Sequence, residues 1–171
     1  ERALASGTTL AGVLEMVKRI RSAVRAPVVI FTYVNPVLRL GVERFADLAR
    51  EAGVDGVLVL DLPIEEAGAF RNALASRGVD TILLLSPTTT DERLRKAAAL
   101  GSGFLYGISR LGVTGARDAV ADGAEALVRR IRGVIPGIPI PTAQFEEILA
   151  TCLNLDRLEK ADTLIRLTLK K

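Results

Sequence analysis

The chain has 171 residues and a net charge of +3, and 49% of its residues are hydrophobic, so it can bury one core of ordinary size. The absence of His and the single Cys152 exclude an internal disulfide and the usual zinc-binding spacings, and we expect neither a metal nor a cofactor. The small charge, the lack of a membrane-length apolar run and the absence of an export signal predict a cytoplasmic protein that binds neither nucleic acid nor membrane.

Four short apolar runs follow one another along the chain. They are Val28 to Phe31, Val57 to Leu60, Ile82 to Leu85 and Phe104 to Ile108. None of them alternates cleanly between apolar and polar residues. Continuous runs of this length are typical of strands in a parallel sheet whose faces are covered by helices.

Apolar residues at helical spacing precede the first run and follow each of the four. The first such helix is expected over Leu10 to Ile20, with Thr8 or Thr9 as its N-cap, and Thr89 with Glu92 is typical of a capping box. Further helices are expected around Phe45 to Ala49, Phe70 to Leu74 and Ala126 to Ile131. One helix followed by four βα units predicts an α/β fold, namely a partial TIM (β/α)8 barrel or half-barrel.

The last part of the chain has a different pattern. Residues 135–141 contain three prolines in seven positions, a spacing that neither a helix nor a central strand tolerates, so we predict an extended linker there. Residues 142–171 are compatible with a short helix followed by helix or edge strand. We therefore predict two parts, the βα repeats of residues 1–134 and an unrelated C-terminal segment of residues 135–171.

Polar side chains gather after each apolar run, where the working residues of α/β barrels lie. Asp61 is compatible with a general base, a ligand to a substrate hydroxyl, a partner contact or a cap of its own turn. Tyr33 fits either a site phenol or the wet end of a core aromatic. Gly112 to Gly115 offers backbone amides to a phosphate or makes a tight turn, and Arg110 beside it is equally consistent with a surface charge.

The amino-acid sequences of these loops are specific. They read Phe31-Thr-Tyr-Val-Asn-Pro, Val59-Leu-Asp-Leu-Pro-Ile-Glu-Glu, Leu85-Ser-Pro-Thr and Tyr106-Gly-Ile-Ser-Arg-Leu-Gly-Val-Thr-Gly. In order and spacing they resemble the tryptophan synthase alpha subunit, and the resemblance runs from residue 1 to about residue 134. It implies the retro-aldol cleavage of indole-3-glycerol phosphate to indole and glyceraldehyde 3-phosphate, a step of tryptophan biosynthesis.

The resemblance also implies roles for individual residues. Tyr33 matches a tyrosine near the family's catalytic aspartate. The positions that match the lining of the indole pocket are Phe31, Leu58, Leu60, Leu84 and Tyr106. Gly115 matches a phosphate-loop glycine, and Arg110 and Thr114 lie in the loop that closes over substrate. Asn35, Asp61 and Pro63 match positions that face the beta subunit.

Two departures from the family pattern shape the functional expectation. Both family carboxylates, a glutamate and an aspartate, match positions upstream of Glu1, so no residue here is assigned as catalytic. After about Val134 the family's remaining phosphate loops do not appear. We therefore expect no lyase activity from this chain alone. The alternative is an engineered, frameshifted or chimeric half-barrel fragment with a structural role, self-associating through its open sheet, and docking to a beta subunit is a third hypothesis.

Overall fold

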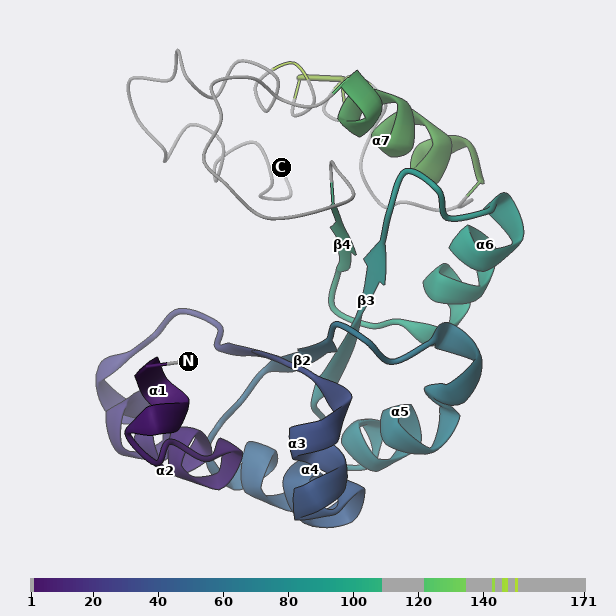
Figure 1. Ribbon diagram of the computed structural model, residues 1–171. Coiled ribbons are helices and arrows are strands. Elements are labelled where there is room, and N and C mark those ends of the chain that lie inside the picture. Colours follow the sequence, from purple (N-terminus) through teal and green to yellow (C-terminus); the bar gives the residue numbers. More distant parts are fainter. Residues whose placement is uncertain (1, 109–121, 135–142, 144–145, 148–149, 151–171) are drawn as a thin grey trace. The chain divides into compact units, whose positions relative to one another are not determined.

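The computed structural model describes residues 2–108, 122–134, 143, 146–147 and 150 (Figure 1). The chain divides into two compact units, one made of residues 1–85 and 92–106 and the other of residues 86–91 and 107–171. The first unit holds most of the sheet, and the second contains the loop that precedes α6 together with α7. Each unit is described by itself below.

Among the described residues, the sheet has four strands in the order β1-β2-β3-β4. Their bounds are β1 Val29–Thr32, β2 Gly56–Val59, β3 Asp80–Leu85 and β4 Leu105–Gly107. The β1–β2 and β2–β3 pairs are parallel. The four strands coincide with the four apolar runs within one or two residues, so the predicted strands and the α/β class are confirmed.

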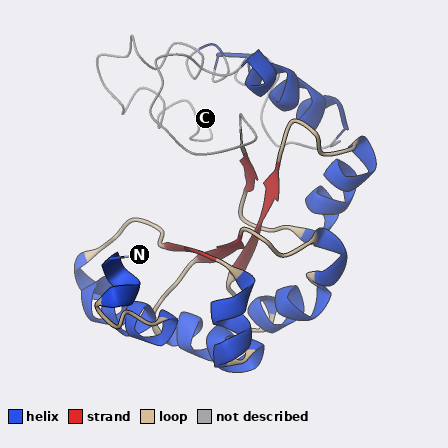
Figure 2. Cartoon of the chain, viewed as in Figure 1, coloured by secondary structure: helices blue, strands red, loops and turns tan. Residues whose placement is uncertain are grey.

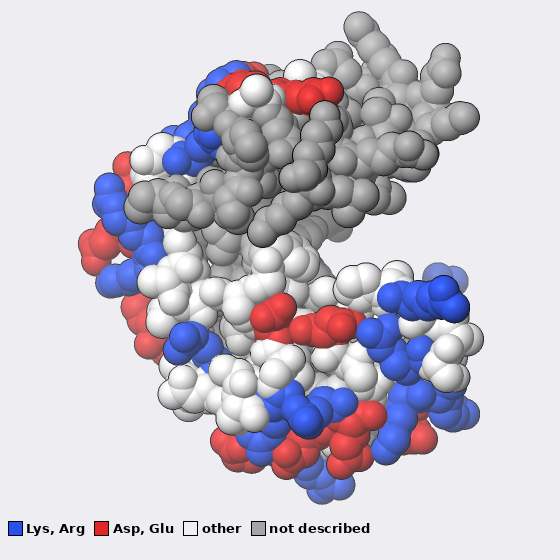
Figure 3. Space-filling view, turned by 180° about the vertical axis from the view of Figure 1, so that it is seen from behind, with Lys and Arg blue, Asp and Glu red and all other residues white. Residues whose placement is uncertain are grey.

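Helices follow each strand and lie on the same side of the sheet in the first unit (Figure 2). The bounds are α1 Arg2–Ala5, α2 Leu10–Ile20, α3 Val34–Leu40, α4 Val42–Glu51, α5 Gly68–Ala75, α6 Asp91–Leu100 and α7 Asp122–Val134, with 3-10 turns η1 Arg21–Ala23 and η2 Ile64–Glu66. Among the described residues, none of these helices has the length and apolarity that crossing a bilayer requires. Figure 3 shows Lys and Arg interspersed with Asp and Glu over the described surface that it displays.

The core of the first unit lies between this helical layer and the sheet. Phe45 of α4 and Phe70 of α5 are buried there with stacked rings, their centroids 6.2 Å apart. Ile30, Val57 and Val59 reach the same cluster from the strands. The continuous apolar composition of the strands is explained by this arrangement, because every second residue meets the helices while the others line the opposite face.

The N-terminus of α2 matches its prediction. Thr9 is the N-cap, and its hydroxyl accepts a hydrogen bond of 3.1 Å from the backbone N–H of Gly12. This contact satisfies one of the amides that the first turn of a helix leaves without a partner.

Two predictions about helix starts were wrong. Residues 34–36 were expected to form a loop, but α3 begins at Val34 and holds Pro36 as its third residue. A proline is tolerated there because first-turn amides have no helical acceptor to lose. The capping box of Thr89 with Glu92 is also absent, since α6 begins at Asp91 and Thr89 instead accepts from the N–H of Ser86.

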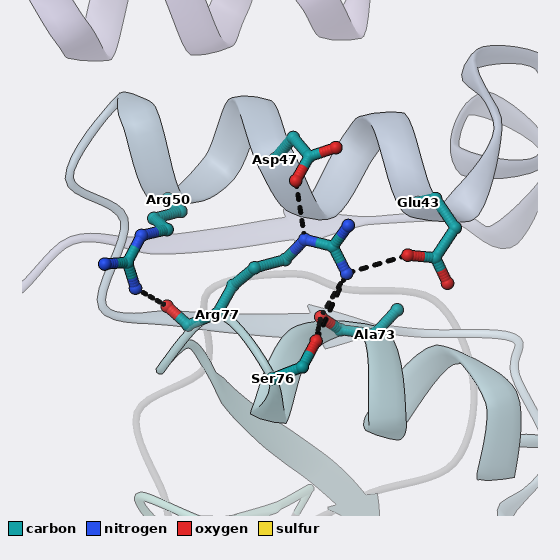
Figure 4. Close-up of polar contacts among 6 residues, drawn as sticks. All are labelled: Glu43, Asp47, Arg50, Ala73, Ser76 and Arg77. Atoms are coloured by element: carbon teal, nitrogen blue, oxygen red, sulfur yellow. Dashed lines mark hydrogen bonds and ion pairs between the residues drawn. The ribbon is translucent and has the colours of Figure 1, made fainter.

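Arg77, just after α5, clamps this helix to α4 (Figure 4). Its Nε donates to Asp47 Oδ1 at 2.7 Å, and its Nη1 lies 2.7 Å from Glu43 Oε2 while also donating to the carbonyl of Ala73 at 3.0 Å. The hydrogen bond from Arg77 lowers the pKa of Asp47. Arg50 in turn donates to the carbonyl of Arg77 at 2.6 Å, so the two helices are joined in both directions.

The predicted tail lies almost wholly outside the described residues. This applies to the linker 135–141 and to most of 142–171. The boundary between 1–134 and 135–171 therefore stays a prediction.

Candidate functional site

The face of the sheet that turns away from the helices carries the candidate site. Phe31, Leu58 and Ile82 are partners in the ladder of β1, β2 and β3, so their side chains share one face. Their sequence neighbours Ile30 and Val57 belong to the helix-side core, which fixes the side on which the row lies. This row is therefore an apolar line across three strands.

Gly56 allows the row to pack closely. A Cβ atom placed on Gly56 would lie 2.8 Å from Cδ1 of Ile82, which is closer than real Cβ contacts. The isoleucine side chain thus lies over the backbone of the neighbouring strand, in the space that only a glycine leaves.

The rings of Phe31 and Tyr106 meet over this face. Their centroids are 5.8 Å apart with an interplanar angle of 62°, an edge-to-face pair. The two residues come from β1 and β4, which are separated by two strands, a distance of roughly 14 Å in a flat sheet. The sheet is therefore curved, with these rings on its concave side, and both rings remain partly exposed at 52% and 39%.

The five residues assigned to the indole pocket, together with Tyr33, lie on or beside this face. Leu58 is fully buried within the row, whereas Leu84 lies two residues beyond Ile82 on the same side and is half-buried. Leu60 follows the end of β2 and is half-buried, and Tyr33 precedes α3 with 58% of its surface exposed. Sequence reasoning missed Ile82 and Gly56, although strand alternation with period two places Gly56 on the same face as Leu58 and Ile82 on the same face as Leu84.

Asp61 connects two of the loops that follow the strands at their carboxyl ends, which are called the rim loops below. Its Oδ1 accepts a hydrogen bond of 2.7 Å from the backbone N–H of Val34, the first residue of α3. The N-cap residue of that helix is Tyr33, whose side chain makes no capping bond, so Asp61 supplies the acceptor from the neighbouring loop. One position earlier, Leu60 donates its N–H to the carbonyl of Thr32 at 2.9 Å.

A second aspartate acts in the same way at the amino end of the strands. Asp55 Oδ2 accepts from the N–H of Val28 at 2.7 Å and from Nη2 of Arg21 at 2.9 Å. Neither the contact of Asp55 with Val28 nor that of Asp61 with Val34 could be predicted from a sequence pattern, because each aspartate lies 27 residues from its backbone donor.

The residues expected to face a partner lie on the rim. Asn35 is the second residue of α3, Pro63 precedes η2, and both are exposed, as is Asp61. Their common location agrees with a contact surface but does not identify the partner, so that role stays a prediction. Arg110, Thr114 and Gly115 lie outside the described residues, and the phosphate-binding role assigned to them stays a prediction as well.

The loop after β3 is held by α7 within the second unit. Arg130 donates through Nη1 to the carbonyl of Pro87 at 3.0 Å and through Nη2 to the carbonyl of Thr89 at 2.6 Å and to Asp91 at 2.8 Å. The hydroxyl of Ser86 lies 3.0 Å from that of Thr88. Arg130 was not predicted, since nothing in a helical arginine indicates a loop partner about forty residues away.

Comparison with known proteins identifies the family. The model of the family described as "Tryptophan synthase alpha chain" matches residues 1–143. The chain belongs to this family. The alpha chain of Citrifermentans bemidjiense is 50% identical over 135 residues, which cover 79% of this chain and 51% of that relative. The alpha chain of Methanosarcina acetivorans is 43% identical over 136 residues, 80% of this chain and 49% of the relative.

Solved structures of the family share the fold. A chain from the tryptophan synthase α2β2 complex of Pyrococcus furiosus superposes with a TM-score of 0.72 at 38% identity, covering 79% of this chain and 54% of that one. The sheet described above is therefore part of a TIM-type α/β barrel, as the repeat pattern predicted. The chain spans about half the length of the alpha-chain relatives that it matches.

Proposed function

We propose that these residues form the indole-binding wall of an alpha-chain barrel that cleaves indole-3-glycerol phosphate in tryptophan biosynthesis. The observation that carries the proposal is the edge-to-face pair of Phe31 and Tyr106 on the concave side of the sheet, with Leu58 in the row beside Phe31. A flat aromatic ligand is bound well by such a surface, because it buries apolar area and meets ring edges and faces.

Indole itself is the probe for this proposal. When indole is added to the purified protein, we expect the NMR signals of the Phe31 and Tyr106 rings to shift more than those of other residues. Phe31→Ala is expected to weaken binding by about tenfold, since an aromatic contact contributes about 0.5–1.5 kcal/mol beyond its buried area. Leu38→Ala is the matched control, because Leu38 is exposed on α3 outside the row. Equal affinity of the wild type and Phe31→Ala would contradict the proposal.

Turnover is a separate question. The family resemblance assigns neither catalytic carboxylate to any of these 171 residues. We therefore expect the protein made of these residues alone to release no measurable indole from indole-3-glycerol phosphate, since loss of a general acid or base costs about a hundredfold to ten-thousandfold. Indole release at the rate of a complete alpha chain would contradict this expectation.

A beta subunit is the proposed partner of the rim. Support comes from the exposed positions of Asn35, Asp61 and Pro63, and a similar solved chain belongs to an α2β2 complex. We expect an immobilised beta subunit to retain the protein, and Asn35→Asp or Pro63→Ala to reduce retention. Undiminished retention of both variants would remove these residues from the interface.

The second candidate is a self-associating half-barrel. It is favoured by the exposed side chains of Phe31 and Tyr106 on the concave face, at 52% and 39%. In this case light scattering gives the mass of a dimer, and Phe31→Glu converts it to a monomer. A wild-type mass of 18.3 kDa at all concentrations would reject this candidate.

A further inference from the structure

We infer that Asp61 is a positioning residue for Tyr33, and that its carboxylate fixes the aromatic rim of the proposed indole site. For the identity of the ligand, this inference rests on the function proposed above. Its geometric part is the hydrogen bond of 2.7 Å between Asp61 Oδ1 and the N–H of Val34.

The backbone on both sides of Tyr33 is fastened to the end of β2. Before it, the carbonyl of Thr32 accepts the N–H of Leu60 at 2.9 Å. After it, the N–H of Val34 donates to Asp61. Two consecutive residues of one loop thus hold the two residues that flank Tyr33, so the placement of its side chain depends on both contacts.

Of these two contacts, only the one made by Asp61 can be removed by a side-chain substitution. The Leu60 contact continues the ladder of a parallel sheet and is present whatever the side chains are. The Asp61 contact depends on one carboxylate, and it also supplies the cap that the side chain of Tyr33 does not provide for α3. Removal of the acceptor is therefore expected to loosen Tyr33 and the first turn of α3 while the sheet persists.

Asp55 provides an internal control of the same chemistry. Its carboxylate also accepts a backbone N–H at 2.7 Å, from Val28, but at the opposite end of the same strand pair. It lies six positions before Asp61 in the sequence, roughly 20 Å along an extended chain. If these carboxylates only anchored β1 to β2, replacing Asp55 would affect Tyr33 as much as replacing Asp61. If Asp61 positions Tyr33, only the replacement of Asp61 should change the Tyr33 signals.

The experiment uses the isotope-labelled protein and the variants Asp61→Ala, Asp61→Asn and Asp55→Ala. The chain has only two tyrosines, so the ring signals of Tyr33 are readily assigned. Asp61→Ala is expected to speed amide exchange at Val34 by about tenfold or more and to shift the Tyr33 ring signals, while exchange at Leu58 stays unchanged. Asp61→Asn retains an oxygen acceptor and should restore both readouts to within about threefold of the wild type.

Ligand binding gives the second readout. Indole affinity is expected to fall at least about threefold in Asp61→Ala and to stay within about twofold in Asp61→Asn and Asp55→Ala. If Asp61→Ala does not fold, Asp61→Leu keeps the shape without an acceptor and replaces it. Unchanged Val34 exchange and Tyr33 signals in the non-acceptor variant, or an Asp61→Asn variant as perturbed as Asp61→Ala, would overturn the positioning role. Failure of the wild type to bind indole would instead reject the proposed function, because the Val34 and Tyr33 readouts need no ligand.

Discussion

Glu65 and Arg93 form a two-point ion pair that joins η2 to α6. The Nε of Arg93 lies 3.1 Å from Oε1 of Glu65, and its Nη2 lies 2.8 Å from Oε2. This parallel geometry is the strongest that a guanidinium and a carboxylate adopt. The hydrogen bond from Arg93 lowers the pKa of Glu65, and the same contact raises the pKa of Arg93.

The lowered pKa of Glu65 predicts how stability depends on pH. Its contribution to folding is complete above the ordinary glutamate pKa, about 4.3, and is lost as the pH falls through the lower folded value. The difference in unfolding free energy between the wild type and Glu65→Gln should therefore be largest near pH 7 and shrink below about pH 4. Urea unfolding at several pH values measures it, with Glu66→Gln as the control. Because both side chains are nearly half exposed, 1 M salt should also reduce the difference. A difference that grows on acidification would contradict the assignment.

Gly56→Ala should destabilise the protein through Ile82. The new Cβ would lie 2.8 Å from Ile82 Cδ1, and overpacking of this kind costs about 1–3 kcal/mol. Ile82→Val removes the clashing Cδ1, so the double variant should recover most of the loss. A double-mutant cycle by urea unfolding tests this, and strictly additive effects would show that the two residues are not in contact.

Two phenylalanines should respond differently to truncation. Phe45→Ala removes a fully buried ring and is expected to cost about 3–5 kcal/mol of unfolding free energy. Phe31→Ala removes a ring that is 52% exposed, so its cost should be much smaller even though it removes a proposed binding residue. Chemical unfolding of both variants compares them. A loss at Phe31 as large as that at Phe45 would indicate that Phe31 is covered in solution.

Thr9→Ala should weaken the N-terminus of α2. The hydroxyl that accepts from Gly12 is lost, and N-cap removal costs about 1 kcal/mol. Thr9→Ser keeps the acceptor and serves as the control. Thermal unfolding of the two variants is the measurement, and equal melting temperatures would argue against the cap.

The strands could be predicted from the sequence because burial on both faces leaves an uninterrupted apolar run such as Val57 to Leu60. The same property concealed which face of the sheet meets the helices, since a run without alternation does not show whether Leu58 or Val57 points toward them. Helix α3 was missed because Asn35-Pro36 is typical of a loop, although a first turn accepts proline.

The site residues came mainly from the family resemblance. Periodicity alone does not bring Phe31 and Tyr106 together, because their contact depends on how far the sheet curves. The contacts of Arg130 and Asp61 depend on side-chain reach across loops, for which a single sequence has no pattern.

The two aspartates that flank β2 also restrict how β1 can pair with it. Asp55 and Asp61 are six positions apart, and so are their donors Val28 and Val34. If β1 slipped by one residue, both carboxylates would lose their donors at once, and Phe31 would exchange sides with Ile30. Although β1 and β2 have only four residues each, a hydrogen bond at each end thus holds the register that keeps the Phe31 ring on the concave side.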